Sequence, residues 1–211
     1  MAEKVRCIII CGSPEADCDF IRKSVCADDY VICADGGYYT ASKAGITPDL
    51  FVSDFDSFNG KIENGVETVK LNTHKDDTDS MHCAKLAVER GFKNILILGA
   101  LGGRLDHTFA NLSVLEYLCD NNITASIESE SESVRVLNSG EYSYTCLKGK
   151  TFSVFPFGCG ETEVTYIGEV EYPAKALKLK SSLAVGISNI FKSDSVKIVI
   201  KSGKALVIVN K

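Results

Sequence analysis

The chain has 211 residues, of which 45% are apolar, and a formal net charge of −5. This length and apolar content suit one large domain or two small ones with real cores, and the negative charge without a basic cluster argues against a nucleic-acid partner. No early apolar run has the form of a signal peptide, and no stretch approaches the ~20 apolar residues of a membrane-spanning helix. We therefore expect a soluble, cytoplasmic protein with neither a membrane nor a nucleic acid as partner.

The cysteines exclude two further classes. There are nine of them, an odd number, and no two are spaced as C-x-x-C. This pattern favours neither a disulfide framework nor a thiolate zinc site. Most lie in apolar runs, so we interpret them as small, reduced core residues.

The first part of the chain alternates strand-like and helical segments. Short apolar runs predict strands at VRCIIIC, VICA, LFVS, VETVKL, ILILG and ITASIE. Helices are expected near residues 17–27, 38–44, 78–90 and 106–119. In the last of these, Leu105, Phe109, Leu112 and Cys119 share one face at helical spacing. Such alternation predicts a Rossmann-like, three-layer α/β domain with a mostly parallel sheet.

The second part has a different pattern. After ESESESVRV, alternating strands and turns follow at YSYTC, TFSVFPF, TEVTYIG, KALKLK, VKIVI and ALVIVN. The charge changes as well, because residues 1–128 carry 12 Lys+Arg against 20 Asp+Glu, whereas residues 129–211 carry 11 against 8. We therefore predict an α/β domain at 1–128 and an antiparallel all-β domain at 133–211.

Polar residues follow several of the predicted strands at their carboxyl ends, where open parallel sheets bind ligands. The four groups are Asp35-Gly36-Gly37, Asp54 with Asp56, Asp76 with Asp77 and Asp79, and Arg104 with Asp106 and His107. If the strands are parallel, all four groups converge on one edge of the sheet.

Each group also has a purely structural interpretation. The glycines could form ordinary turns, and one aspartate of the third group could cap a helix. Asp54 and Asp56 could point apart into water, and Arg104 could pair with Asp106 in a weak surface contact. Alternatively, Arg104 could grip a phosphate, with the Gly102–Gly103 amides binding phosphate at a helix N-terminus.

Taken together, the groups point to phosphate chemistry. Carboxylate oxygens without cysteine or histidine clusters suit Mg²⁺, which is commonly held by one or two carboxylates and substrate phosphates. An arginine and glycine-rich turns nearby fit phosphoryl or pyrophosphoryl transfer. However, neither G-x-x-x-x-G-K-[ST] nor G-x-G-x-x-G occurs in the sequence.

Four motifs, in this order and spacing, resemble the thiamine pyrophosphokinase (thiamin diphosphokinase) family. They are ADGG (34–37), GITPDLFVSDFDS (45–57), KDDTD (75–79) and GGRLDH (102–107), and GISN (186–189) extends the similarity into the second part. The resemblance implies transfer of the pyrophosphoryl group of ATP to the hydroxyl of thiamine, giving thiamine diphosphate and AMP. It also implies a homodimer with shared active sites and a C-terminal β-sandwich-like domain that binds thiamine and forms the dimer.

The resemblance further implies roles for individual residues. Mg²⁺ would be bound by Asp54, Asp56 and Asp79. The ATP phosphates would lie near Asp35, Gly36, Gly37 and His107, with Ser57 and Thr78 as hydroxyl donors. Arg104 would counter charge on the transferred group, and Asp106 would orient that group or the metal-bound waters. Ser188 and Asn189 of the partner subunit would contact thiamine.

This chain departs from the family pattern at two points. Ser53 replaces the glycine that usually begins the second motif, and the chain has no tryptophan to place beside thiamine. Phe191 or a tyrosine could stack on thiamine instead.

Three other functions remain open. Haloacid-dehalogenase phosphatases have a D-x-D after a strand, although normally after the first, and nucleotide-sugar glycosyltransferases use D-x-D to bind metal. The third alternative is a non-catalytic thiamine or nucleotide sensor on the same fold.

Overall fold

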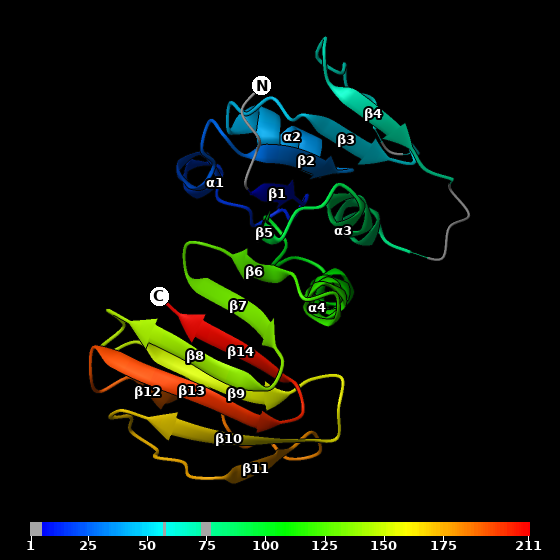
Figure 1. Ribbon diagram of the computed structural model, residues 1–211. Coiled ribbons are helices and arrows are strands. Elements are labelled where there is room, and N and C mark those ends of the chain that lie inside the picture. Colours follow the sequence, from blue (N-terminus) through cyan, green and yellow to red (C-terminus); the bar gives the residue numbers. More distant parts are fainter. Residues whose placement is uncertain (1–5, 57, 73–76) are drawn as a thin grey trace. The chain divides into compact units, whose positions relative to one another are not determined.

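The computed structural model describes residues 6–56, 58–72 and 77–211. The chain forms two compact units, and the boundary between them lies between Glu130 and Ser131 (Figure 1). In the described part of the chain, no helix is both long and apolar enough to cross a membrane.

The first unit is a parallel sheet with helices packed against it. Its strands are β1 (Cys7–Ile10), β2 (Tyr30–Ala34), β3 (Leu50–Ser53), β4 (Glu67–Lys70), β5 (Asn94–Leu98) and β6 (Thr124–Glu128). Its helices are α1 (Cys18–Ser24), α2 (Gly37–Lys43), α3 (Asp79–Glu89) and α4 (Leu105–Asp120). Neighbouring strands run parallel in the order β4-β3-β2-β1-β5-β6. The predicted parallel sheet and its helices are therefore confirmed.

Both faces of this sheet are covered, which is why its strands are almost continuously apolar. Ile8 and Ile10 of β1 pack in one cluster with Ile21 of α1 and Tyr38 of α2. Since side chains alternate along a strand, Ile9 points to the opposite face, and it too is fully buried. Contacts of α3 with β1, β2 and β3 show that this helix lies on the sheet as well.

The buried face of α4 differs from the predicted apolar face. The helix buries Asn111, Val114, Leu115, Leu118 and Cys119. Leu105 and Phe109, which were placed on the apolar face, are 81% and 61% exposed. The first turns of α4 border a pocket and do not pack on the sheet. The helical spacing of apolar residues in these turns therefore does not mean that they are buried.

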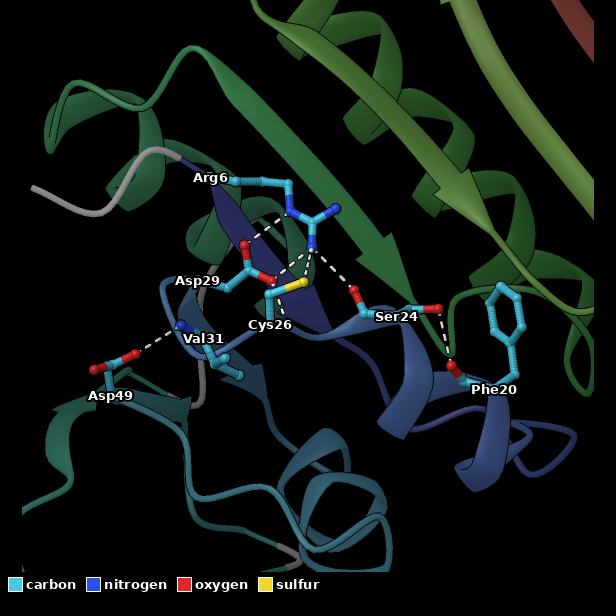
Figure 2. Close-up of polar contacts among 7 residues, drawn as sticks. All are labelled: Arg6, Phe20, Ser24, Cys26, Asp29, Val31 and Asp49. Atoms are coloured by element: carbon cyan, nitrogen blue, oxygen red, sulfur yellow. Dashed lines mark hydrogen bonds and ion pairs between the residues drawn. The ribbon is translucent and has the colours of Figure 1, made fainter.

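A polar cluster ties the amino ends of the first strands together, at the edge of the sheet opposite the predicted site (Figure 2). The Arg6 guanidinium donates to both carboxylate oxygens of Asp29, through Nε at 2.8 Å and Nη2 at 2.6 Å. It also donates to the Ser24 carbonyl, and Asp29 accepts from the Cys26 amide. Asp29 is buried, and its carboxylate raises the pKa of Arg6. The cluster therefore fixes the α1–β2 connection against β1.

The second unit is built from antiparallel strands. They are β7 (Glu132–Leu137), β8 (Gly140–Thr145), β9 (Thr151–Pro156), β10 (Glu161–Ile167), β11 (Leu177–Lys180), β12 (Asn189–Ile190), β13 (Ser195–Ser202) and β14 (Ala205–Asn210). One set pairs as β12-β9-β14-β7 and the other as β11-β10-β13-β8. Both sets contribute to one apolar cluster, in which the rings of Phe152 and Phe191 stack 4.3 Å apart.

Gly37 marks a close approach between α2 and β1. A Cβ at this position would lie 2.0 Å from the Ile10 carbonyl oxygen, whereas one at Gly36 would meet nothing nearer than 3.6 Å. A real Cβ does not reach 2.0 Å from a backbone oxygen, so any side chain at position 37 pushes α2 away from the sheet.

We therefore predict that Gly37→Ala lowers the free energy of unfolding by at least about 2 kcal/mol. The matched variant Gly36→Ala should change it by less than about 1 kcal/mol. Urea unfolding followed by circular dichroism measures both. Equal stability of the two variants would contradict the close approach.

Candidate active site

The strand order places a pocket at one edge of the first unit. From β1 the chain moves to β2 and β3 on one side, and it later enters β5 and β6 on the other. Loops leaving the carboxyl ends of β1 and β5 therefore diverge, which is where open α/β sheets bind ligands. A pocket of about 660 Å³ lies there.

Most of the predicted site residues in this unit line the pocket. Those that do are Asp35, Gly36, Thr78, Asp79, Arg104, Asp106 and His107. Gly37, Asp54 and Asp56 are described but are not among the lining residues. Ser57 and Asp76 lie outside the described residues. Three of the four strand-end groups thus converge on one pocket, and the D-x-D is connected to it through Asp35.

The loop after β1 also lines the pocket, and the sequence analysis missed it. Gly12, Ser13 and Pro14 belong to the lining, and the Ser13 amide donates to the Gly99 carbonyl at 3.0 Å. The strand-end rule already used for the other loops applies equally to GSP after the first strand. This loop lacks charged residues before Glu15, so its sequence carries no carboxylate that would mark it as part of a site.

The turn before α4 has the backbone of an anion-binding turn. Gly102 and Gly103 have φ angles of 85° and 67°, a conformation that glycine adopts without strain. The Gly103 amide donates to Glu15 Oε1 at 2.9 Å. The Gly103 amide thus points outward from the turn and binds a carboxylate oxygen, as an anion-binding turn would.

Arg104 and Asp106 form a two-pronged ion pair at the mouth of the pocket. Arg104 Nε lies 3.1 Å from Asp106 Oδ1, and Nη2 lies 2.6 Å from Oδ2. This pairing holds the pKa of Asp106 below its usual value and raises that of Arg104. Both side chains are exposed, so the pair adds little stability but fixes the direction of the guanidinium.

The start of α3 brings a carboxylate to the pocket. Thr78 caps the helix, its Oγ1 accepting from the Met81 amide at 3.2 Å. Asp79 follows in the first turn and lines the pocket. Asp77 instead pairs with Lys85 of the same helix, an ion pair that lowers its pKa. Of the described aspartates of this group, Asp79 is therefore the one placed to act in the pocket.

The D-x-D lies in a tight turn after β3. Phe55, between the two aspartates, has a φ of 63°, and its ring packs on Phe51. The Asp56 amide donates to Asp54 Oδ1 at 3.1 Å. A bulky residue in this conformation is strained, and strain of this kind is often found at functional sites.

Ser53 connects this turn to the pocket. It is fully buried, donates from Oγ to Asp35 Oδ1 at 2.8 Å and accepts from the Phe55 amide at 3.0 Å. Asp35 itself has a positive φ of 42° and lines the pocket. The hydroxyl of Ser53 therefore links the carboxyl ends of β2 and β3, a role that the usual glycine could not fill.

Cysteine chemistry is not favoured in the pocket. Cys11 is the lining cysteine, and burial raises the pKa of its thiol to about 12. A thiol with this pKa stays protonated at neutral pH, so it is neither a good nucleophile nor a good metal ligand.

The carboxylates expected to bind Mg²⁺ have suitable chemistry, but the described part of the chain does not gather them into a metal site. Within residues 6–56, 58–72 and 77–211, no three His, Cys, Asp or Glu side chains gather closely enough to hold a metal ion. The oxygens of Asp54, Asp56 and Asp79 are nonetheless hard ligands, and Mg²⁺ takes few protein ligands when substrate phosphates supply the others.

A comparison with known families decides what kind of protein this is. The family model for the thiamin pyrophosphokinase catalytic domain matches residues 21–127, about half of the chain. The chain belongs to the thiamin pyrophosphokinase family. The match covers the D-x-D, the start of α3 and the Gly102–Gly103 turn.

Curated relatives and solved structures agree with this assignment. The thiamine pyrophosphokinase of Bacillus subtilis (strain 168) is 29% identical over 164 residues, covering 75% of this chain and 76% of that protein. The thiamin pyrophosphokinase 1 of Caenorhabditis elegans is 26% identical over 169 residues, covering 76% and 68%. A crystal structure of the Bacillus subtilis enzyme superposes with a TM-score of 0.86 at 24% identity, covering 98% of this chain and 99% of that one. The last comparison shows a shared fold.

The residues expected at thiamine in this family member lie in the second unit. Ser188 is exposed and has a φ of 55°, and its amide donates to Ser153 Oγ at 3.0 Å. Asn189 is buried, and its side chain accepts from the Tyr172 amide at 2.9 Å and donates to the Tyr172 carbonyl at 2.8 Å. Asn189 thus holds the backbone of Tyr172. Phe191 is buried in the core, so it is not available to stack on a ligand.

We predict that Ser53→Ala lowers the free energy of unfolding by about 1–3 kcal/mol, because Asp35 and the Phe55 amide each lose a hydrogen-bond partner. The exposed Ser143→Ala serves as control and should change stability by less than about 0.5 kcal/mol. Chemical denaturation at pH 7 measures both. A Ser53 variant as stable as the Ser143 variant would show that the hydrogen bonds of Ser53 do not contribute to the free energy of unfolding.

Proposed function

We propose that this chain is a thiamine pyrophosphokinase that transfers the pyrophosphoryl group of ATP to the hydroxyl of thiamine, producing thiamine diphosphate and AMP. The observation that carries the proposal is one pocket lined by an anion-binding turn, an arginine and the aspartates Asp35 and Asp79, in a chain of this family.

The ATP phosphates fit the side of the pocket formed by the turn before α4. The 16-residue helix α4 directs its N-terminus, with its partial positive charge, at this side. Arg104 and His107 line the same side. Asp106 keeps the Arg104 guanidinium in a defined direction through the two bonds between them, so the positive charge is already in place when a phosphate binds.

Asp54, Asp56 and Asp79 are the residues that would hold Mg²⁺ together with these phosphates. When bound, the ion would neutralise negative charge on the phosphates. The D-x-D turn presents two carboxylates from a strained, packed backbone, and Asp79 comes from the first turn of α3.

The reaction requires little covalent chemistry from the protein. The thiamine oxygen forms a bond to the β-phosphorus, the bond from that phosphorus to the bridging oxygen of AMP breaks, and AMP leaves with the electron pair. The thiamine hydroxyl proton is released to solvent or to a nearby carboxylate. In a loose transition state, positioning and charge neutralisation dominate, and Arg104 faces the charge that develops.

The remaining roles follow from the same proposal. The Rossmann-like domain, residues 1–128, binds ATP and Mg²⁺, while the β-sandwich-like domain, residues 133–211, binds thiamine and forms the homodimer. Ser188 contacts thiamine from the partner subunit, while Asn189 shapes the site by holding the Tyr172 backbone. Tyr172 is 63% exposed, and we propose that its ring takes the role of the tryptophan that this chain lacks. All nine cysteines are free thiols, which suits a reducing cytoplasm.

The proposal is tested by incubating the protein with ATP, Mg²⁺ and thiamine and separating the products. AMP and thiamine diphosphate in equal amounts support the kinase. Inorganic phosphate would support a phosphatase, and no product would support a sensor.

Asp54→Asn and Asp56→Asn should each lower kcat by at least ~10²-fold, because each removes a carboxylate that neutralises phosphate charge through the metal. Asp28→Asn, an exposed aspartate of the same unit outside the pocket lining, is the matched control and should retain full activity. Near-normal turnover in both D-x-D variants would contradict the metal assignment.

A further inference from the structure

A chain of side-chain hydrogen bonds crosses the floor of the pocket. Asn111 of α4 donates from Nδ2 to the Ala100 carbonyl at 2.8 Å, and its Oδ1 accepts from Ser80 Oγ at 2.8 Å. Ser80 Oγ in turn lies 3.1 Å from Thr78 Oγ1. Ser80 and Asn111 are buried, and all four residues line the pocket. The chain thus joins the start of α3, the body of α4 and the loop after β5.

The direction of every bond in this chain is determined. A carbonyl oxygen accepts but cannot donate, so Ala100 fixes which end of the Asn111 amide carries the N–H groups. Asn111 Oδ1 therefore faces Ser80, and Ser80 donates its single hydroxyl proton to this oxygen. Ser80 then has to accept from Thr78, so the Thr78 hydroxyl donates inward.

This direction changes what Thr78 offers to a substrate. Its one hydroxyl proton is used on Ser80, and one of its lone pairs accepts the Met81 amide. Thr78 therefore has no proton to give to a phosphate, although one lone pair remains to accept a hydrogen bond. With this direction Thr78 would not donate its hydroxyl proton to ATP, in contrast to the role expected from the sequence.

We propose that Asn111 is a positioning residue for the pyrophosphoryl transfer. Through Ser80 and Thr78 it sets the first turn of α3, which carries Asp79, against the loop that leads from Ala100 to the Gly102–Gly103 turn. This inference rests on the proposed function, since it concerns the geometry of that reaction. Asn111 touches no reacting atom; it keeps two phosphate-facing elements at a fixed separation, and misplacement of such elements by about 1 Å costs up to ~10²-fold in rate.

The test uses variants that remove one link at a time. Ser80→Ala breaks the chain in the middle, and Asn111→Leu, which keeps the size of the side chain, breaks both bonds of the amide. We expect each to lower kcat by ~10- to 100-fold. The dissociation constant for ATP, measured by calorimetry without metal, should stay within about threefold of wild type, because neither residue donates to the phosphates. Ser113→Ala, a hydroxyl deletion on the same helix, is the matched control and should keep wild-type kcat.

The double variant Ser80→Ala/Asn111→Leu distinguishes a connected chain from two separate packing defects. If the links act as one unit, the double variant is no slower than the slower single variant. Thr78→Ser keeps the hydroxyl and should retain activity within about threefold, whereas Thr78→Val should lose ~10-fold or more in kcat. Because Thr78 is exposed, these two variants test the chain even where a buried substitution fails to fold.

Three results would overturn the inference. The first is a wild-type kcat in Ser80→Ala, and the second is a loss of kcat in the double variant equal to the product of the two single losses. The third is a Thr78→Val variant with unchanged kcat and at least tenfold weaker ATP binding. Failure of the wild-type protein to form AMP would instead overturn the proposed function, so the two failures are distinguishable.

Discussion

The pocket exists because the strand order reverses between β1 and β5. All strands of the first unit point the same way, and the chain leaves β1 toward one side of the sheet and later fills the other side from β5. The two loops at this point cannot close over each other, so the sheet edge stays open there. The phosphate-facing groups of the site take their positions from this constraint.

The segments around the pocket must also keep a defined conformation, because they carry the charged groups of the site. Side chains from one segment bind backbone or side-chain groups of another: Ser53 bonds to Asp35, Glu15 to the Gly103 amide, and Ser80 to Asn111. Each contact joins segments that are at least 18 residues apart. These contacts hold segments of the site in fixed relative positions, which electrostatic catalysis requires.

The amino-acid sequence was sufficient to predict much of this arrangement, and the reasons are local. The four helices of the first unit were expected at 17–27, 38–44, 78–90 and 106–119, and they form at Cys18–Ser24, Gly37–Lys43, Asp79–Glu89 and Leu105–Asp120. Apolar runs and the alternation of elements depend on neighbouring residues, so they are visible in one sequence. The convergence of Asp35, Asp79 and Arg104 followed from the strand-end rule alone.

Other features could not be predicted, because they depend on contacts distant in sequence. Leu105 and Phe109 have the spacing of core residues, but the first turns of α4 border the pocket. Asn111 is a polar residue on an otherwise apolar helix face. The sequence does not show the hydrogen bonds to Ser80 and the Ala100 carbonyl that account for its position. The burial of Phe191 against Phe152 likewise depends on the pairing of two strands.

The most direct test of the account is a crystal structure of the protein with a non-hydrolysable ATP analogue and Mn²⁺ in place of Mg²⁺. We predict an anomalous peak at about 2.1 Å from carboxylate oxygens of the D-x-D and of Asp79, with the phosphates on the Gly102–Gly103 turn. A nucleotide bound away from the crevice between β1 and β5, or a metal held by other residues, would contradict the account.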